Sequence, residues 1–224
     1  MKRGPKPKGK VKIEWSANFA YAIGLFVTDG CVYGDRRHVS FVSKDFEQIR
    51  NIMRCLNIHS NIGHNYSGYK FSHTYRIQIG DVNFVKFLLQ IGIGPAKSKV
   101  LKEIAIPSEY FFHFLRGVFD GDGYIHSYYD RRWKVSFLWY LGFCSASPVF
   151  LSWIRWELLN RINVKGHVTK SKNSSCFQLK YAKSEAEKIM THLYMGGEIL
   201  YLTRKKLKFE AILAIVRTLK SLEG

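Results

Sequence analysis

Acidic side chains are scarce in this sequence. Its 224 residues include 17 Asp and Glu against 35 Lys and Arg, which gives a formal net charge of +18. A surface with so few carboxylates carries a broad positive field that attracts polyanions. The composition therefore favours nucleic acid as the partner.

Long apolar runs are also missing. The longest, such as the one from Phe19 to Val27, are too short to span a bilayer. The first twelve residues are basic, and no apolar segment of signal type follows them. We therefore expect no membrane association and an intracellular protein, in the cytoplasm, the nucleoid or an organelle.

Cysteine is sparse, and no Cys-x-x-Cys pair occurs. This argues against a zinc knuckle and against a disulfide framework, so we expect reduced, partly buried thiols. Cys55, His59 and His64 are close in sequence, but a structural zinc site needs a fourth ligand nearby. The four cysteines are Cys31, Cys55, Cys144 and Cys176.

The apolar fraction of 46% and the length suit a globular chain of one or two small domains. Residues 1–12 interleave basic residues with glycine and proline, which predicts a flexible basic arm. Such an arm would lie along phosphates or in a minor groove, or form a solvated tail. We divide the remainder into residues 13–100 and 101–224.

This division follows from an internal repeat. The run Gly24-Leu25-Phe26-Val27-Thr28-Asp29-Gly30 returns as Gly117-Val118-Phe119-Asp120-Gly121-Asp122-Gly123, and each match is offset by 93 residues. The flanks repeat as well, with helices expected to begin near Ser16 and Ser108 as N-caps. The chain is therefore predicted to consist of two similar halves.

The element order in each half is helix, two strands, helix, two strands, helix, which predicts an α+β fold. Asp45, Asp81, Ser147 and Ser184 are expected to cap helices, the last in a capping box with Glu187. Hairpins are expected within residues 58–80 and 164–182. A final helix over 202–222 is expected to bury a stripe of Leu207, Ile212, Ile215 and Leu219.

Glycine in the interior of a helix destabilises it by about 1 kcal/mol relative to alanine. The presence of Gly24 and Gly117 in apolar helices therefore requires an explanation. Close packing of the two helices against each other supplies one, and it would bring Asp29 and Asp122 together at the helix ends. Gly30 and Gly123 would then end the helices in left-handed conformation.

Two carboxylates at the negative ends of two helix dipoles repel each other. A divalent cation such as Mg²⁺ or Mn²⁺ would turn this repulsion into a net attraction, since hard cations take oxygen ligands. Such a cation also assists phosphodiester hydrolysis. A single Asp-Gly pair is a common helix-to-turn signal, but a matched pair on a basic chain favours a cation site.

Residues 22–30 and 115–123 together resemble two degenerate copies of the LAGLIDADG motif of homing endonucleases and RNA maturases. The resemblance implies two αββαββα repeats whose antiparallel sheets form a saddle over the DNA major groove, with the motif helices at the interface. It also implies that Asp29 and Asp122 are catalytic metal ligands, joined by the backbone carbonyls of Thr28 and Gly121.

The resemblance further implies a basic residue after the second strand, which fits Lys44 in the first half. Lys44 is therefore the candidate for stabilising charge and positioning water, with an ordinary exposed lysine as the alternative. The second half has the uncharged Ala146 at this place. Either the two halves cut their DNA strands at unequal rates, or another basic residue such as Lys134 takes this role in the second half. We expect Asp120, two residues before Asp122, to be a surface or capping residue.

Alternating polar and apolar residues in the later strands predict a sheet with one face toward DNA. Arg76, Gln78, Gln178 and Lys180 are placed to reach base edges. Basic residues of the predicted turns would contact phosphates and position the duplex. The phosphate candidates are Arg36, Arg37, Lys70, Arg131, Arg132, Lys134, Lys170 and Lys172.

The sequence thus predicts a divalent-metal-dependent DNA endonuclease that acts as a monomer. Because the halves differ, its double-stranded target would be long and imperfectly symmetric. Two alternatives remain open: an RNA maturase with intron RNA as a partner, and a DNA-binding regulator that kept the fold and lost the chemistry.

Overall fold

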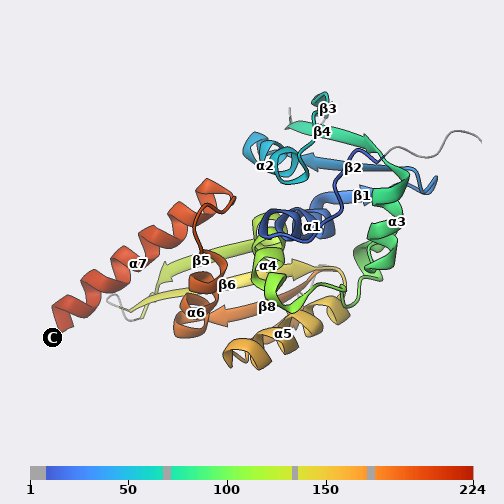
Figure 1. Cartoon of the computed structure of the whole chain (residues 1–224). Coiled ribbons are helices and arrows are strands. Elements are labelled where there is room, and N and C mark those ends of the chain that lie inside the picture. The colour runs from blue at the N-terminus through green and yellow to red at the C-terminus, as the bar shows by residue number, and fades with distance from the viewer. Residues whose placement is uncertain (1–8, 68–71, 133–135, 171–174, 224) are drawn as a thin grey trace, which may run out of the picture.

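The computed structural model describes residues 9–67, 72–132, 136–170 and 175–223. Within them, seven α-helices accompany two sheets of four strands each, and two of the helices lie between the sheets (Figure 1). The predicted α+β fold with two four-stranded antiparallel sheets is confirmed. Within the described residues, none of the helices combines the length and the apolar character needed to cross a membrane.

The first sheet has the strand order β1-β2-β4-β3, with antiparallel neighbours throughout. Helices α2 and α3 pack on one of its faces. The elements of this half are α1 (Ala17–Asp29), β1 (Gly30–Val32), β2 (His38–Ser43), α2 (Phe46–Leu56), β3 (Gly63–Ser67), β4 (Ser72–Gly80) and α3 (Val82–Gln90).

The second sheet repeats this order as β5-β6-β8-β7, again antiparallel. Two single turns of 3-10 helix, Lys97–Lys99 and Ser108–Tyr110, lie in the connection between the halves. The elements of this half are α4 (Phe111–Asp122), β5 (Gly123–Tyr129), β6 (Phe137–Ser145), α5 (Pro148–Ile162), β7 (His167–Lys170), β8 (Phe177–Ala182), α6 (Lys183–Leu193) and α7 (Thr203–Glu223).

Helices α1 and α4 lie side by side between the two sheets (Figure 1). A Cβ on Gly24 would lie 2.1 Å from the carbonyl oxygen of Phe114, and one on Gly117 would lie 2.1 Å from that of Tyr21. No side chain larger than hydrogen fits at either position. The predicted close packing of the two helices through these glycines is confirmed.

Three of the predicted caps are confirmed. Ser16 accepts a hydrogen bond from the Phe19 N–H, Asp81 from those of Asn83 and Phe84, and Ser147 from that of Phe150. These bonds satisfy N–H groups that a helix leaves unpaired in its first turn.

The other predicted caps lack the expected side-chain hydrogen bond. Ser108 lies in a 3-10 turn before α4. Asp45 occupies the predicted N-cap position of α2, but its carboxylate makes no capping hydrogen bond and accepts from Arg204 at 2.6 Å instead. Ser184 does not cap α6, which starts one residue earlier, at Lys183. Lys183 itself turns the chain out of β8 with a φ of 45°.

The predicted stripe of the final helix is correct at Ile212, which is buried, and Ile215 and Leu219 are half-buried, but the prediction is wrong at Leu207. Leu207 is 57% exposed, whereas Lys205, Phe209 and Ile212 are buried. These three follow helical spacing, and Lys205 is fixed against the end of α4. That contact sets the rotation of α7 and turns Leu207 outward.

The described part of the predicted basic arm is attached to the first half. The backbone N–H groups of Lys10 and Val11 donate to the Asp81 carboxylate at 2.5 and 2.9 Å, and Val11 is buried. Asp81 therefore caps α3 and anchors the incoming chain with the same side chain. Residues 1–8 lie outside the described residues.

Candidate functional site

Asp29 and Asp122 are the last residues of α1 and α4, and the packed glycines bring these two helix ends together. A Cβ on Gly121 would lie 2.9 Å from the Asp29 carboxylate and 2.0 Å from the Thr28 hydroxyl. Asp29 is half-buried and Asp122 is exposed. We call Asp29 and Asp122 the acidic pair.

Gly30 and Gly123 do not end the helices as predicted. Both have extended backbone, with φ of −81°, and each begins a strand directly. The left-handed prediction was wrong because the helix passes into a strand without a turn. A Cβ would lie 2.6 Å from the Phe26 carbonyl oxygen at Gly30 and 2.5 Å from that of Phe119 at Gly123. Crowding against the last helical turn, and not positive φ, explains these glycines.

The acidic pair is electrostatically strained. Desolvation raises the pKa of Asp29, although hydrogen bonds from Thr28 and Gln48 lower it in part. Partial desolvation and then the charge of Asp29 raise the pKa of Asp122 to about 6. Loss of solvent is thus the main reason that both carboxylates resist ionisation, and the charge of Asp29 adds to this effect at Asp122.

Two lysines that sequence analysis missed lie beside the acidic pair. Lys205, at the start of α7, donates from Nζ to the carbonyl oxygens of Phe119 at 2.5 Å and Gly123 at 2.6 Å. Lys97, in the connection after α3, donates to the carbonyl oxygen of Gly30. Both lysines are buried. They donate to backbone carbonyl groups at the two helix-to-strand junctions.

These ammonium groups also compensate the carboxylate charges. Burial lowers the pKa of both lysines, for Lys205 to about 8, while Asp29 and Asp122 act to raise both values. Lys205 Nζ is 3.3 Å from the Gly121 carbonyl oxygen, one of the backbone groups predicted to bind metal. The internal repeat did not reveal these two lysines. Lys97 and Lys205 are 108 residues apart, whereas the two motif copies are offset by 93 residues.

Lys44 is exposed directly after β2. A nearby side chain, Gln48 of α2, donates to the Asp29 carboxylate at 3.3 Å and accepts from the Ser43 hydroxyl at 2.6 Å. Gln48 was not singled out from the sequence. In the second half Ala146 is half-buried at the corresponding place. The catalytic role of Lys44 remains a prediction.

Asp120 is not on the surface, so that expectation was wrong. It is 1% exposed, and one carboxylate oxygen accepts from the Tyr21 hydroxyl and the Leu202 N–H, both at 2.7 Å. Burial raises its pKa to about 6. The far side of α4 meets the segment leading into α7, so Asp120 joins that segment to both motif helices.

The predicted DNA contacts occupy the sheet faces opposite the core. Ile77 and Ile79 are buried, while Arg76 and Gln78 alternate with them on the other face of β4. Arg76 donates to the Tyr33 hydroxyl and to Gln78. On β8, Gln178 and Lys180 alternate with buried Leu179 and Tyr181 in the same way.

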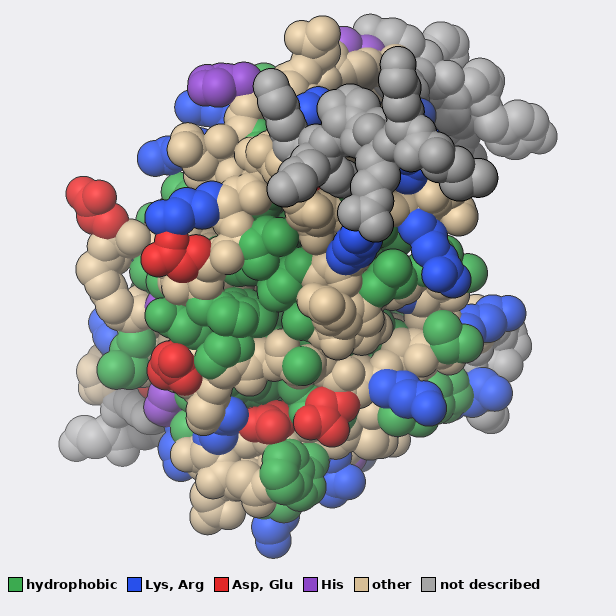
Figure 2. Space-filling view, turned by 45° about the vertical axis from the view of Figure 1, so that its right-hand side comes forward, with side chains coloured by type: hydrophobic (Ala, Val, Ile, Leu, Met, Phe, Trp, Pro, Cys, Tyr) green, Lys and Arg blue, Asp and Glu red, His purple; other side chains and the backbone are tan. Residues whose placement is uncertain are grey.

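The predicted phosphate contacts are exposed wherever they are described. Lysine and arginine side chains are spread over the molecular face shown in Figure 2. Lys70, Lys134 and Lys172 lie outside the described residues. The exposed candidates are Arg36, Arg37, Arg131, Arg132 and Lys170.

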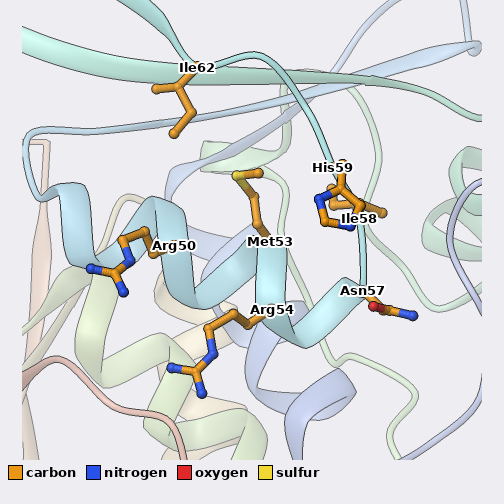
Figure 3. Close-up of a pocket in the computed structure, with 7 residues that line it drawn as sticks. All are labelled: Arg50, Met53, Arg54, Asn57, Ile58, His59 and Ile62. Carbon is orange, nitrogen blue, oxygen red and sulfur yellow. The ribbon is translucent and has the colours of Figure 1, made fainter.

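A pocket on the outer side of α2 is a poor alternative centre for metal chemistry (Figure 3). Its lining includes two arginines but no carboxylate, so it lacks the oxygen ligands that hard cations prefer. Within the described residues, no group of three or more His, Cys, Asp or Glu forms a metal cluster. The lining residues are Arg50, Met53, Arg54, Asn57, Ile58, His59 and Ile62.

Residues 16–92 match the family model of the LAGLIDADG-like domain. The chain thus contains a LAGLIDADG-like domain, and over its described residues it has the fold of the single-chain LAGLIDADG homing endonucleases. The resemblance seen in the sequence is confirmed. A comparison with curated proteins found no match.

Solved structures with this fold include homing endonucleases and DUF199/WhiA. The homing endonuclease I-LtrWI bound to target DNA is 12% identical, with a TM-score of 0.61 over 90% of this chain and 91% of that chain. I-SmaMI, bound to uncleaved DNA in the presence of calcium ions, is 11% identical, with a TM-score of 0.56 over 94% and 92%. Full-length DUF199/WhiA from Thermatoga maritima is 14% identical, with a TM-score of 0.54 over 91% and 69%.

Proposed function

We propose that the chain is a site-specific DNA endonuclease that hydrolyses phosphodiester bonds with a divalent cation at the acidic pair. The observation that carries this proposal is the meeting of Asp29 and Asp122 where α1 and α4 end. Two partly desolvated carboxylates side by side weaken a fold unless a cation is bound between them. Their raised pKa values express that cost.

The donor set fits a hard cation. Two carboxylates would hold it, the carbonyl groups of Thr28 and Gly121 lie beside them, and DNA phosphate and water would complete the ligands. Mg²⁺ or Mn²⁺ bound there would activate water and neutralise charge on the phosphate. Solved structures of the same fold contain DNA with manganese and uncleaved DNA in the presence of calcium, which supports the binding of DNA together with a divalent cation.

The residues of the chain divide the work. Asp29 and Asp122 would hold the cation, Gln48 orients Asp29 by a hydrogen bond, and Lys97 and Lys205 place positive charge beside the two carboxylates. Lys44 is proposed to position water from the first half-site. The unequal halves, residues 13–100 and 101–224, would grip a long, imperfectly symmetric duplex as a monomer.

A DNA-binding regulator without cleavage is the second candidate. The Lys205 ammonium group, 3.3 Å from the Gly121 carbonyl oxygen, favours it. An ammonium group at this place would substitute for part of the cation charge. Both candidates share the proposed DNA contacts and differ in the use of the acidic pair.

Selection from a randomised duplex library separates the two. The chain is incubated with the library in Mg²⁺, in Mn²⁺ and in EDTA, and cut and merely bound molecules are recovered and sequenced separately. A common cut sequence that needs the metal supports the nuclease. A common bound sequence that stays intact in both metals leaves the regulator as the function.

A further inference from the structure

Two histidine side chains meet between the neighbouring strands β3 and β4, which lie at the top of Figure 1. His64 Nδ1 and His73 Nε2 are 2.8 Å apart and share a hydrogen bond, and the planes of the two rings differ by 13°. The sequence groups His64 with Cys55 and His59, but in the structure its imidazole contacts that of His73. We call His64 and His73 the histidine pair.

The histidine pair lies on the face of the first sheet that is opposite to the proposed DNA contacts. His64 is directly across from Tyr75, and directly opposed residues share one face of a sheet. His73, Tyr75 and the buried Ile77 follow one another at a period of two, so they lie on the core side of β4, whereas Arg76 lies on the other side. Duplex recognition therefore does not account for the pair.

Aromatic rings support both imidazoles from the same side of the sheet. The Tyr75 ring centre is 4.4 Å from that of His73 and 5.5 Å from that of His64, and the Phe46 ring at the start of α2 is 5.0 Å from that of Tyr75. The hydrogen bond between the two histidines is nevertheless open to solvent. Two side chains that are already ordered lose less conformational entropy when a ligand binds than two unrestrained side chains do.

The facing nitrogens of the pair can become two metal ligands by a change of tautomer. A neutral imidazole has one protonated ring nitrogen and one nitrogen with a free lone pair. The hydrogen bond needs a proton on one of the two facing nitrogens. When this proton is instead on the other nitrogen of the same ring, both lone pairs face the space between the rings, and no proton is gained or lost.

The distance between the facing nitrogens is close to that of a metal chelate. Zn²⁺ holds imidazole nitrogens at about 2.0–2.1 Å, and a tetrahedral arrangement then places two of them about 3.3 Å apart. The pair would have to open by about 0.5 Å from its hydrogen-bonded distance of 2.8 Å. His64 is exposed, so a small rotation of its side chain provides this movement, and water would supply the remaining ligands.

We propose that the histidine pair binds one borderline divalent cation, Zn²⁺, Ni²⁺ or Cu²⁺, which links β3 to β4. Imidazole suits these ions, whereas Mg²⁺, Mn²⁺ and Ca²⁺ favour oxygen ligands such as those of the acidic pair. The two sites would therefore take different classes of cation. Because β3 is the outer strand of its sheet, a cation between the strands would hold this edge in place. This binding requires neither DNA nor cleavage.

Isothermal titration calorimetry of the full chain, without an affinity tag, tests the proposal with ZnCl₂ and NiCl₂ in a large excess of Mg²⁺. The test variants are His64→Gln and His73→Gln, each of which keeps one imidazole of the pair. His59→Gln is the matched control, because His59 is another exposed histidine of the same half. Thermal unfolding in EDTA verifies that each variant is folded, and unfolding in Zn²⁺ measures the stabilisation by the metal.

The unsubstituted chain should bind one Zn²⁺ or Ni²⁺ ion at the pair, and Zn²⁺ should raise its Tm above the value in EDTA. Each test variant should bind about 10-fold more weakly or less, because one of two metal–nitrogen bonds is lost, and should gain little Tm from Zn²⁺. His59→Gln should behave as the unsubstituted chain does. Unchanged affinity in both test variants would overturn the proposal, and so would an equal loss of affinity in His59→Gln.

Discussion

Gly24 of α1 lies against Gly117 of α4, and a Cβ on either residue would be 2.9 Å from the Cα of the other. This contact lets two helices approach almost backbone to backbone. Because each aspartate follows its glycine by five residues, the same contact places Asp29 beside Asp122. The position of the acidic pair thus depends on the contact between the two glycines.

Substitution of Gly24 or Gly117 by alanine should therefore destabilise the chain. Alanine gains about 1 kcal/mol in helix propensity, but a carbon 2.1 Å from a backbone oxygen forces the helices apart, and overpacking costs about 1–3 kcal/mol or more. We expect Tm to fall by about 5 °C or more in thermal unfolding. The control is Gly34→Ala, where nothing lies within 4 Å. Equal Tm values for Gly117→Ala and Gly34→Ala would contradict the packing.

The raised pKa of Asp122 predicts a pH-dependent effect of Asp122→Asn. The folded chain ionises this group at about pH 6, whereas the unfolded chain does so at about pH 3.9. Between these values the folded chain holds the proton longer, so the stability contributed by this group falls as pH rises. In EDTA, the variant should gain Tm relative to the unsubstituted chain between about pH 4.5 and about pH 7.5. If the Tm difference between the variant and the unsubstituted chain is the same at both pH values, the pKa of Asp122 is not raised in the folded chain.

Lys205→Met should destabilise the junction of α4 with β5. The substitution leaves the buried carbonyl oxygens of Phe119 and Gly123 without this donor, at a cost of about 1–3 kcal/mol. Chemical unfolding should show this loss in the free energy of unfolding. The rate of DNA cleavage should fall by more than the decrease in the folded fraction accounts for. Lys208→Met, an exposed position of the same helix, serves as the control. If both variants unfold alike, Lys205 does not hold the junction.

Arg36 and Arg76 should affect DNA binding in different ways. Arg36 is exposed at the β1–β2 turn, so Arg36→Ala should weaken binding to all duplexes and reduce the salt slope by about one. Arg76 lies on the sheet face with Gln78, so Arg76→Ala should relax base preference at one position. Binding isotherms at several salt concentrations, with a selected site and its single-base variants, measure both effects. Identical profiles for the two variants would contradict the assignment.

The repeated parts of the architecture could be predicted from the sequence. A fixed offset from Gly24 to Gly117 was enough to find the helix pair, the aspartates and the order of the strands, because local pattern and motif agree in both halves. Ser16, Asp81 and Ser147 were found as caps by the same local chemistry.

Contacts between distant segments could not be predicted in this way. Lys97 and Lys205 reach the helix ends from the connection and from α7, and neither carries a local pattern that marks it. Asp120 was misjudged because its burial depends on Leu202, which is 82 residues away. Gly30 was predicted to end the helix in left-handed conformation, but glycine is required there because a Cβ would clash with the last helical turn.

Cleavage of a selected duplex by Asp29→Asn and Asp122→Asn tests the central claim most directly. Each change removes one carboxylate charge and keeps the shape of the side chain, while binding to the same duplex is measured in Ca²⁺ as a control. We predict that both variants bind the duplex but do not cut it in Mg²⁺ or Mn²⁺. Cutting at an undiminished rate by either variant would show that the acidic pair is not the catalytic centre.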